Sequence, residues 1–225
     1  RYLSVKDKPR KETKQIDFLA PKDAQRFLAA LESKPLFWRC FMNVLITCGL
    51  RRGEANGLQW GDIDGDALTL NVARNVTIDK NSPDKIHIGE TKGKESRTVP
   101  LSPRVYAMLM TFKHEQEEKY NGKLLPSAYI FCSTVNPYAP QYPTVPTRWQ
   151  ARFVKRHNLP NVSPHDLRHT AATLALDGGA DLKQVQQLLG HKDPATTMRF
   201  YAGVTEEAER RTVQGIESVL ASGEN

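Results

Sequence analysis

Four short segments, well separated along the chain, carry side chains suited to phosphate chemistry. The first, CGLRRGEANGLQW, places Arg51 and Glu54 directly after an apolar run. An arginine suits a phosphate because its planar guanidinium group donates two parallel hydrogen bonds and keeps its charge. A charged pair beside an apolar run can also mark a helix end that reaches solvent. Two interpretations of Arg51 therefore stay open, and in one of them Glu54 orients the arginine toward an anion.

The second and third segments add a lysine, a histidine and a further arginine. Lys92 and Lys94 lie in ETKGKES, a presumed hairpin turn, and lysines in such turns are often only exposed to solvent. On a mobile hairpin, Lys92 could instead enter a groove or deliver a proton. In VSPHDLRHTAAT, His165 and Arg168 are three residues apart and share one face of a predicted helix over 164–178. They lie near its start, where free backbone N–H groups and the helix dipole favour an anion. Chance helices also produce such a pair.

The fourth segment, LLGHKDPATTMRFYAGV, contains His191 and Tyr201. His191 follows Gly190, which predicts the end of a helix and an exposed corner. Taken alone, Tyr201 is typical of a packed core aromatic. A tyrosine hydroxyl has a pKa near 10, so only about one in a thousand is ionised at pH 7, and a reactive tyrosine needs a general base or nearby positive charge.

The sequence carries no pattern for a metal or a cofactor. Zinc-finger spacing, HEXXH, the P-loop, GxGxxG and GxSxG are all missing, and His165 and His169 at i, i+4 have no obvious third ligand. We therefore predict no metal site and no cofactor. Two arginines, a lysine, two histidines and a tyrosine fit transesterification at a phosphodiester, because arginines can neutralise the charge that develops on the non-bridging oxygens.

In their order along the chain, the four segments resemble the tyrosine recombinases, the phage-integrase family, over about residues 18–221. The resemblance implies that Arg51 and Arg168 bind the scissile phosphate and that Lys92 is the general acid to the 5′-hydroxyl. It implies the remaining roles as follows: His165 as an acid/base group, His191 as a hydrogen-bond donor to the phosphate, Tyr201 as the nucleophile that forms a 3′-phosphotyrosine, and Glu54 as the supporting acidic residue. Lys92 fits the TKGK pattern better than Lys94, although sequence does not fix a hairpin register.

The resemblance also implies a function and partners. We expect a site-specific DNA recombinase, the integrase of a phage or mobile element, for DNA integration or excision without metal or ATP. Its expected partners are double-stranded DNA with specific core sites, three further copies in a homotetramer on paired sites, and accessory DNA-bending proteins, with no membrane; the expected location is the bacterial cytoplasm. The alternatives are a type IB topoisomerase-like DNA-relaxing enzyme, a non-cleaving DNA-binding relative and a metal-dependent phosphodiesterase, the last disfavoured by the missing carboxylate cluster.

Helices must position most of these residues. The segment FLAPKDAQRFLAALESK predicts a helix with Pro21 in its first turn, and PLFWRCFMNVLITCGL, apolar on nearly every face, predicts a buried central helix that ends at Gly49. A short helix should follow over RRGEANGLQW. Further helices are predicted over 102–119, 145–158, 164–178 with Ser163 as N-cap, 181–190 with Asp181 as N-cap, a short one near 195–200, and 205–221.

Short β-branched segments interrupt the helices near residues 62–100. ALTLNVA, NVTID, KIHIGE and RTVPL predict a small antiparallel sheet, and ETKGKESRTVPL predicts a hairpin with a turn rich in lysine and glycine. The predicted fold class is therefore α+β, mainly helical, like a tyrosine recombinase catalytic domain.

Composition and charge agree with a DNA-binding globular protein. The 225 residues are 39% apolar and 25% charged, with a net charge of +7, a modest bias toward a polyanion. The family resemblance implies that residues 1–17 are a linker or arm from a missing N-terminal core-binding domain and that 18–225 form the catalytic domain. An apolar stripe of Val213, Ile216 and Leu220 in helix 205–221 would pack on its own domain or on a neighbouring protomer.

Overall fold

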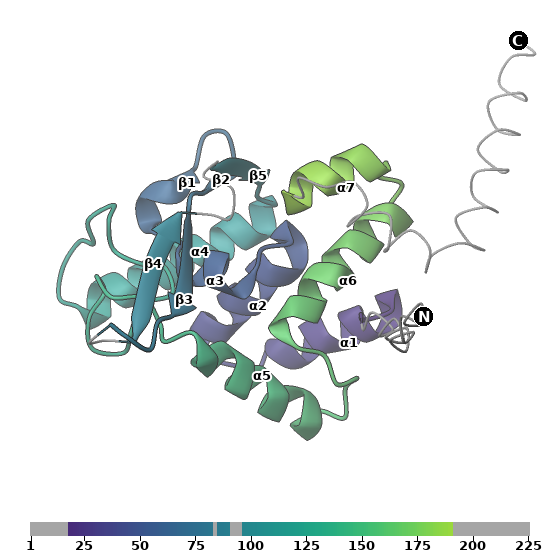
Figure 1. Cartoon of the computed structure of the whole chain (residues 1–225), viewed down its shortest axis with the longest axis horizontal. Helices are drawn as coiled ribbons and strands as arrows, with labels where there is room; N and C mark the ends of the chain where they lie inside the picture. The colour runs from purple at the N-terminus through teal and green to yellow at the C-terminus, as the bar shows by residue number, and fades with distance from the viewer. Residues whose placement is uncertain (1–17, 83–84, 91–95, 191–225) are drawn as a thin grey trace, which may run out of the picture.

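The computed structural model describes residues 18–82, 85–90 and 96–190 (Figure 1). The described helices are α1 (Pro21–Leu31), α2 (Leu36–Cys48), α3 (Arg52–Asn56), α4 (Pro103–Lys119), α5 (Thr144–Arg156), α6 (Pro164–Asp177) and α7 (Leu182–Leu189), with a 3₁₀-helix η1 (Trp60–Asp62). The described strands are β1 (Ile63–Asp64), β2 (Thr69–Val72), β3 (Arg74–Ile78), β4 (Ile86–Glu90) and β5 (Arg97–Pro100). Figure 1 shows α2 in the centre, with β3 and β4 on one side of it and α6 and α7 on the other.

Capping residues define where the helices begin. The Ser163 hydroxyl accepts a hydrogen bond from the Asp166 N–H at 3.4 Å, and the Asp166 carboxylate accepts one from the Ser163 N–H at 2.7 Å. Asp181 caps α7 in the same way, by accepting from the Gln184 N–H at 2.7 Å. The helices predicted over 102–119, 145–158, 164–178 and 181–190 are confirmed with small boundary changes. Those predicted near 195–200 and over 205–221 lie outside the described residues.

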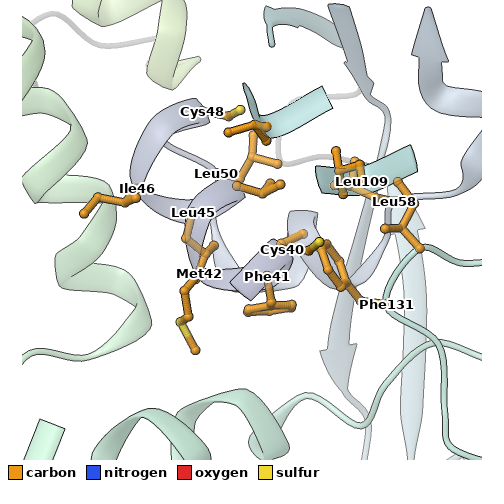
Figure 2. Close-up of a cluster of buried hydrophobic side chains, with 14 of the residues drawn as sticks. Cys40, Phe41, Met42, Leu45, Ile46, Cys48, Leu50, Leu58, Leu109 and Phe131 are labelled. Carbon is orange, nitrogen blue, oxygen red and sulfur yellow. The ribbon is translucent and has the colours of Figure 1, made fainter. Parts of the chain in front are cut away.

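Helix α2 forms the centre of the hydrophobic core, as its apolar sequence predicts. Every residue from Cys40 to Ile46 is buried, and Figure 2 shows its side chains leaving the helix in several directions, toward Leu109 of α4 among others. The rings of Phe41 and Phe131 meet edge to face, with their centroids 4.8 Å apart. Burial of each large apolar side chain contributes about 1.5–3 kcal/mol, so the end of α2 is a rigid support for whatever follows it.

The three cysteines are part of this interior. Cys40, Cys48 and Cys132 are buried and form no disulfide, and burial raises the pKa of the Cys40 thiol to about 12. Thiols protonated at neutral pH are poor nucleophiles, which confirms that Cys40 and Cys48 are small buried apolar residues.

The strands are antiparallel, as predicted, but the expectation of a single sheet was wrong. Strands β1, β2 and β5 form one sheet in the order β1-β2-β5, and β3 and β4 form a separate pair. The hairpin predicted over 90–101 was wrong for the same reason, because β4 pairs with β3 whereas β5 pairs with β2. Val99 of β5 is fully buried, whereas no residue of β4 is. The sequence of β4 therefore has no clear inward face, and it gave little indication of which strand β4 pairs with.

None of the helices in the described ranges is both long and apolar enough to cross a bilayer.

Candidate active site

The segment after α2 turns sharply and presents Arg51 at the start of α3. Gly49 ends α2 with a φ of +61°, a left-handed conformation that glycine adopts without a steric penalty. Arg51 is the N-cap residue of α3, and Glu54 reaches back to it: one carboxylate oxygen accepts from the Arg51 backbone N–H at 2.8 Å, the other from Arg51 Nη1 at 2.7 Å. Glu54 therefore holds Arg51 through both its backbone and its side chain, which is the contact that one of the two interpretations of the sequence predicted.

Arg168 joins the ends of two helices. Its side chain is 1% exposed, and it donates from Nη1 to the Gly49 carbonyl at 2.7 Å and from Nη2 to the Leu189 carbonyl. These carbonyls lie at the C-terminal ends of α2 and α7, where helix carbonyls lack intrahelical partners and the dipole is negative. Nη1 also lies 3.8 Å from a Glu54 oxygen. The second predicted arginine is therefore next to the Arg51–Glu54 pair.

His165 and His169 follow each other along α6 by one turn. Their rings meet edge to face with centroids 4.6 Å apart, and His165 is the more exposed of the two. Partial burial lowers the pKa of His165, as do the charges of Arg168 and Arg51, against the opposing effect of Asp166. The described residues hold no group of three potential metal ligands around this pair. His165 is thus a mainly neutral imidazole near two arginines, a form that can accept a proton.

The structure adds one residue that the sequence analysis missed. Arg97, the first residue of β5, donates from Nη1 and Nη2 to the two oxygens of Glu54, at 3.0 Å and 2.7 Å. Its sequence signal was available: Arg97 is two residues before buried Val99, so it lies on the same face of the strand. A charged residue at an inward strand position requires a buried partner of opposite charge.

The electrostatic state of Glu54 follows from this environment. Burial alone would raise its pKa, but the hydrogen bonds and charge of Arg97, the Arg51 N–H and the charge of Arg168 together lower the pKa from 4.5 to about 2. Burial, together with the charges of Arg51 and Arg97, lowers the pKa of Arg168 to about 9, while Glu54 opposes the change, so the arginine stays protonated at neutral pH. Three guanidinium groups thus surround one carboxylate, and the positive excess favours binding of an anion.

The structure therefore brings together Arg51, Glu54 and Arg168 and places His165 one turn before Arg168. The other predicted site residues, Lys92, His191 and Tyr201, lie outside the described residues. The residues on either side of these gaps are described. Strand β5, which begins at Arg97, follows the segment that contains Lys92, and Gly190 directly precedes His191. Gly190 has a φ of +64° and lies so close to Arg97 that a β-carbon on it would be 2.7 Å from Arg97 Cδ.

The described residues thus form a helical domain with two small antiparallel sheets, in which the buried Glu54 carboxylate binds Arg51 and Arg97 and lies next to Arg168. The model of the phage integrase family matches residues 17–208, and the chain belongs to that family. The ICEBs1 integrase of Bacillus subtilis is 26% identical over 92% of this chain and 56% of its own length. A tyrosine recombinase XerC of Pediococcus pentosaceus is 31% identical over 74% of this chain and 49% of its own.

Solved structures share the fold. The Tn1549 transposon integrase in complex with transposon right end DNA superposes with a TM-score of 0.75 at 22% identity, over 92% of this chain and 68% of that one. XerA recombinase superposes with a TM-score of 0.67 at 24% identity, over 88% and 64%. These likenesses confirm the predicted fold class. The chain spans about half the length of the curated relatives it matches.

Proposed function

We propose that the protein is a site-specific DNA recombinase, the integrase of a phage or other mobile element, which cleaves and rejoins DNA through a 3′-phosphotyrosine. The observation that carries the proposal is the buried Glu54 carboxylate that holds Arg51 beside Arg168 in a member of the phage integrase family. Relatives named ICEBs1 integrase and transposase from transposon Tn916 support integration as the task. Neighbours solved with transposon or core-site DNA support DNA as the substrate.

The described residues account for how the scissile phosphate would be held. Arg51 has a side chain that is 33% exposed, and among the described residues its guanidinium hydrogen bond is made by Nη1 alone. Its other nitrogens are therefore free to approach the non-bridging oxygens of a phosphate. Arg168 supplies a second positive charge, and its position is fixed because its guanidinium group donates to two backbone carbonyls. Because both groups are positioned before DNA arrives, they stabilise developing charge without reorganisation.

In the proposed cleavage step, the hydroxyl oxygen of Tyr201 attacks the scissile phosphorus as its proton passes to a base, a role assigned to His165. The bond from phosphorus to the 5′-oxygen breaks, and Lys92 gives the 5′-oxygen a proton, while His191 donates a hydrogen bond to the phosphate. The new bond joins Tyr201 to the 3′-phosphate. Rejoining is the reverse attack by a 5′-hydroxyl of the partner duplex, so the phosphodiester count is conserved and ATP is not consumed.

The wider assembly belongs to the same proposal. We expect a homotetramer on two duplexes that carry paired core sites, with accessory DNA-bending proteins, in the bacterial cytoplasm. Residues 1–17 would link the catalytic domain, 18–225, to a core-binding domain. The helix over 205–221 would use Val213, Ile216 and Leu220 to dock on a neighbouring protomer.

The proposal is tested by trapping the covalent intermediate. The full-length protein is incubated in EDTA with a nicked suicide duplex that carries its core site, and a DNA–protein adduct is sought on a denaturing gel. We expect an adduct in the unaltered protein and none in Tyr201→Phe. Tyr138→Phe is the matched control, because Tyr138 is exposed and outside the described cluster, and it should form the adduct normally.

The alternatives give different results. DNA binding without any adduct would indicate a non-cleaving relative and would overturn the proposal. An adduct that is followed by relaxation of supercoiled DNA, but never by strand exchange between two duplexes, would indicate a topoisomerase-like activity. Cleavage that EDTA abolishes would indicate a metal-dependent phosphodiesterase.

A further inference from the structure

The hydrogen bonds of Glu54 come from two arginines that are far apart in sequence. Each carboxylate oxygen accepts two: one accepts from Arg51 Nη1 and Arg97 Nη1, the other from the Arg51 N–H and Arg97 Nη2. Arg97 thus forms the bidentate pair, which fixes the plane of the carboxylate as well as its position. The Arg51 side chain holds only one of these oxygens.

Arg97 is itself held in place by its surroundings. Its side chain is 15% exposed, and its Nε is buried with no hydrogen-bond partner among the described residues. The stem lies against Gly190, where a β-carbon would approach Cδ to 2.7 Å and Nε to 3.0 Å. Figure 1 shows β5 beside the end of α7 in agreement with this contact. The guanidinium group therefore fills the space between α3 and the residue that directly precedes His191 in the sequence.

We propose that Arg97 is a positioning residue of the catalytic site. It fixes the Glu54 carboxylate, and the carboxylate in turn fixes the direction in which Arg51 presents its remaining N–H groups. Without Arg97, the carboxylate keeps only its two bonds from Arg51 and loses the bidentate pair that fixes its plane, so Arg51 Nη1 is held less firmly. Both Nη atoms of Arg97 donate to Glu54 and its Nε is buried, so its effect on the phosphate is exerted through Glu54. This inference rests on the proposed recombinase function.

The competing explanation is that the Arg97–Glu54 ion pair only stabilises the fold. A DNA substrate with an uncharged linkage at the scissile position distinguishes this explanation from the positioning role. A methylphosphonate at the cleavage position carries no charge, so it depends far less on correctly aimed arginines. We expect Arg97→Lys in the full-length protein to lower the single-turnover cleavage rate by about 10- to 100-fold on a phosphodiester. On the methylphosphonate duplex the loss should stay within about threefold. Equal losses on both substrates would mean that Arg97 only supports the fold.

The second measurement needs no cleavage. In a Tyr201→Phe background, the dissociation constants of duplexes with a phosphodiester and with a methylphosphonate at the scissile position are compared. We expect the charged duplex to bind more tightly and Arg97→Lys to reduce that preference by at least about threefold. An unchanged preference would overturn the role of Arg97, even if the unaltered protein formed no adduct. Absence of the adduct would by itself overturn only the recombinase function.

Arg74→Lys is the matched control. Arg74 forms the same kind of half-buried pair with Asp62 and donates from Nε to the Gly57 carbonyl at 3.0 Å, at the other end of α3. Its variant should leave the ratio of the two cleavage rates unchanged. Arg97→Met, which keeps the stem but removes the charge, should exceed the effect of Arg97→Lys; if it does not fold, the lysine variant and the binding measurement decide.

Discussion

Replacement of Glu54 by glutamine tests the electrostatic reasoning most directly. The carboxylate is 1% exposed, and its surroundings lower its pKa from 4.5 to about 2. A pKa difference of about 2.5 corresponds to about 3 kcal/mol of folding free energy at neutral pH. Because glutamine accepts fewer hydrogen bonds and leaves buried arginines without a counter-charge, we expect Glu54→Gln to lower the free energy of unfolding by about 3–5 kcal/mol at pH 7.

The pH dependence of this loss has a definite sign. The folded protein has the lower pKa, so the stabilisation is complete above the ordinary pKa of 4.5 and disappears as pH falls through about 2. The difference between the unaltered protein and Glu54→Gln should therefore be constant from pH 8 to 5, and then shrink toward the acid. Urea unfolding followed by circular dichroism at pH 7, 5, 4 and 3 measures it.

A matched exposed pair gives the control. Asp23 pairs with Arg26 at 2.8 Å on the surface, so Asp23→Asn should change the free energy of unfolding by less than about 0.5 kcal/mol. A loss below about 1 kcal/mol in Glu54→Gln at pH 7, or a loss that stays the same down to pH 3, would refute the view that the arginines hold the carboxylate ionised.

Three further outcomes follow from the described geometry. Gly190→Ala should lower the free energy of unfolding by about 1–2 kcal/mol in urea titrations, because Gly190 has a φ of +64° and lies against Arg97. Gly122→Ala is the control: Gly122 has open space around it, so the free energy of unfolding should change by less than about 0.5 kcal/mol. Arg168→Lys should lower the free energy of unfolding by about 2 kcal/mol and the rate of adduct formation by at least about 100-fold, because one ammonium group cannot bridge two carbonyls as a guanidinium group does. A normal rate would contradict the proposed role of Arg168 in binding the phosphate. Burial lowers the pKa of His169 from 6.5 to about 4, so the unfolded chain takes up the proton first and stability falls as pH drops from 6.5 to 4. His169→Gln should flatten that pH dependence of the thermal midpoint, and an identical slope in both proteins would disprove it.

Local signals in the sequence predicted the helices and part of the site. Ser163 and Asp181 fix their helix starts through reciprocal hydrogen bonds with the residue three positions later, and Gly49 ends α2 because it adopts a left-handed conformation. These features depend on residues within four positions of one another, which is the range over which a sequence pattern is informative. Four ordered segments, which contain Arg51, Lys92, His165, Arg168, His191 and Tyr201, indicated the family, and in the structure Arg51 and Arg168 both lie near Glu54.

Pairings over long distances were not predictable in the same way. Strand β5 pairs with β2 rather than with β4, and Arg97 meets Glu54 across 43 positions. Neither contact has a local signature, because an inward strand position specifies that a partner exists but not which one. Arg97 was therefore missed: its position two residues before Val99 is compatible with a buried acidic partner, but only the three-dimensional structure identifies that partner as Glu54.

The hydrogen bond from Arg168 to the Gly49 carbonyl spans 119 positions of the chain, and its companion bond reaches forward to Leu189. A protein is synthesised from its N-terminus, so a ribosome that has completed the first half of this chain has made Arg51 and Glu54 but not the arginine that lies against them. The anion site cannot assemble until α6 and α7 have emerged and closed on α2. An unfinished chain therefore carries only part of the anion site, the part formed by Arg51 and Glu54.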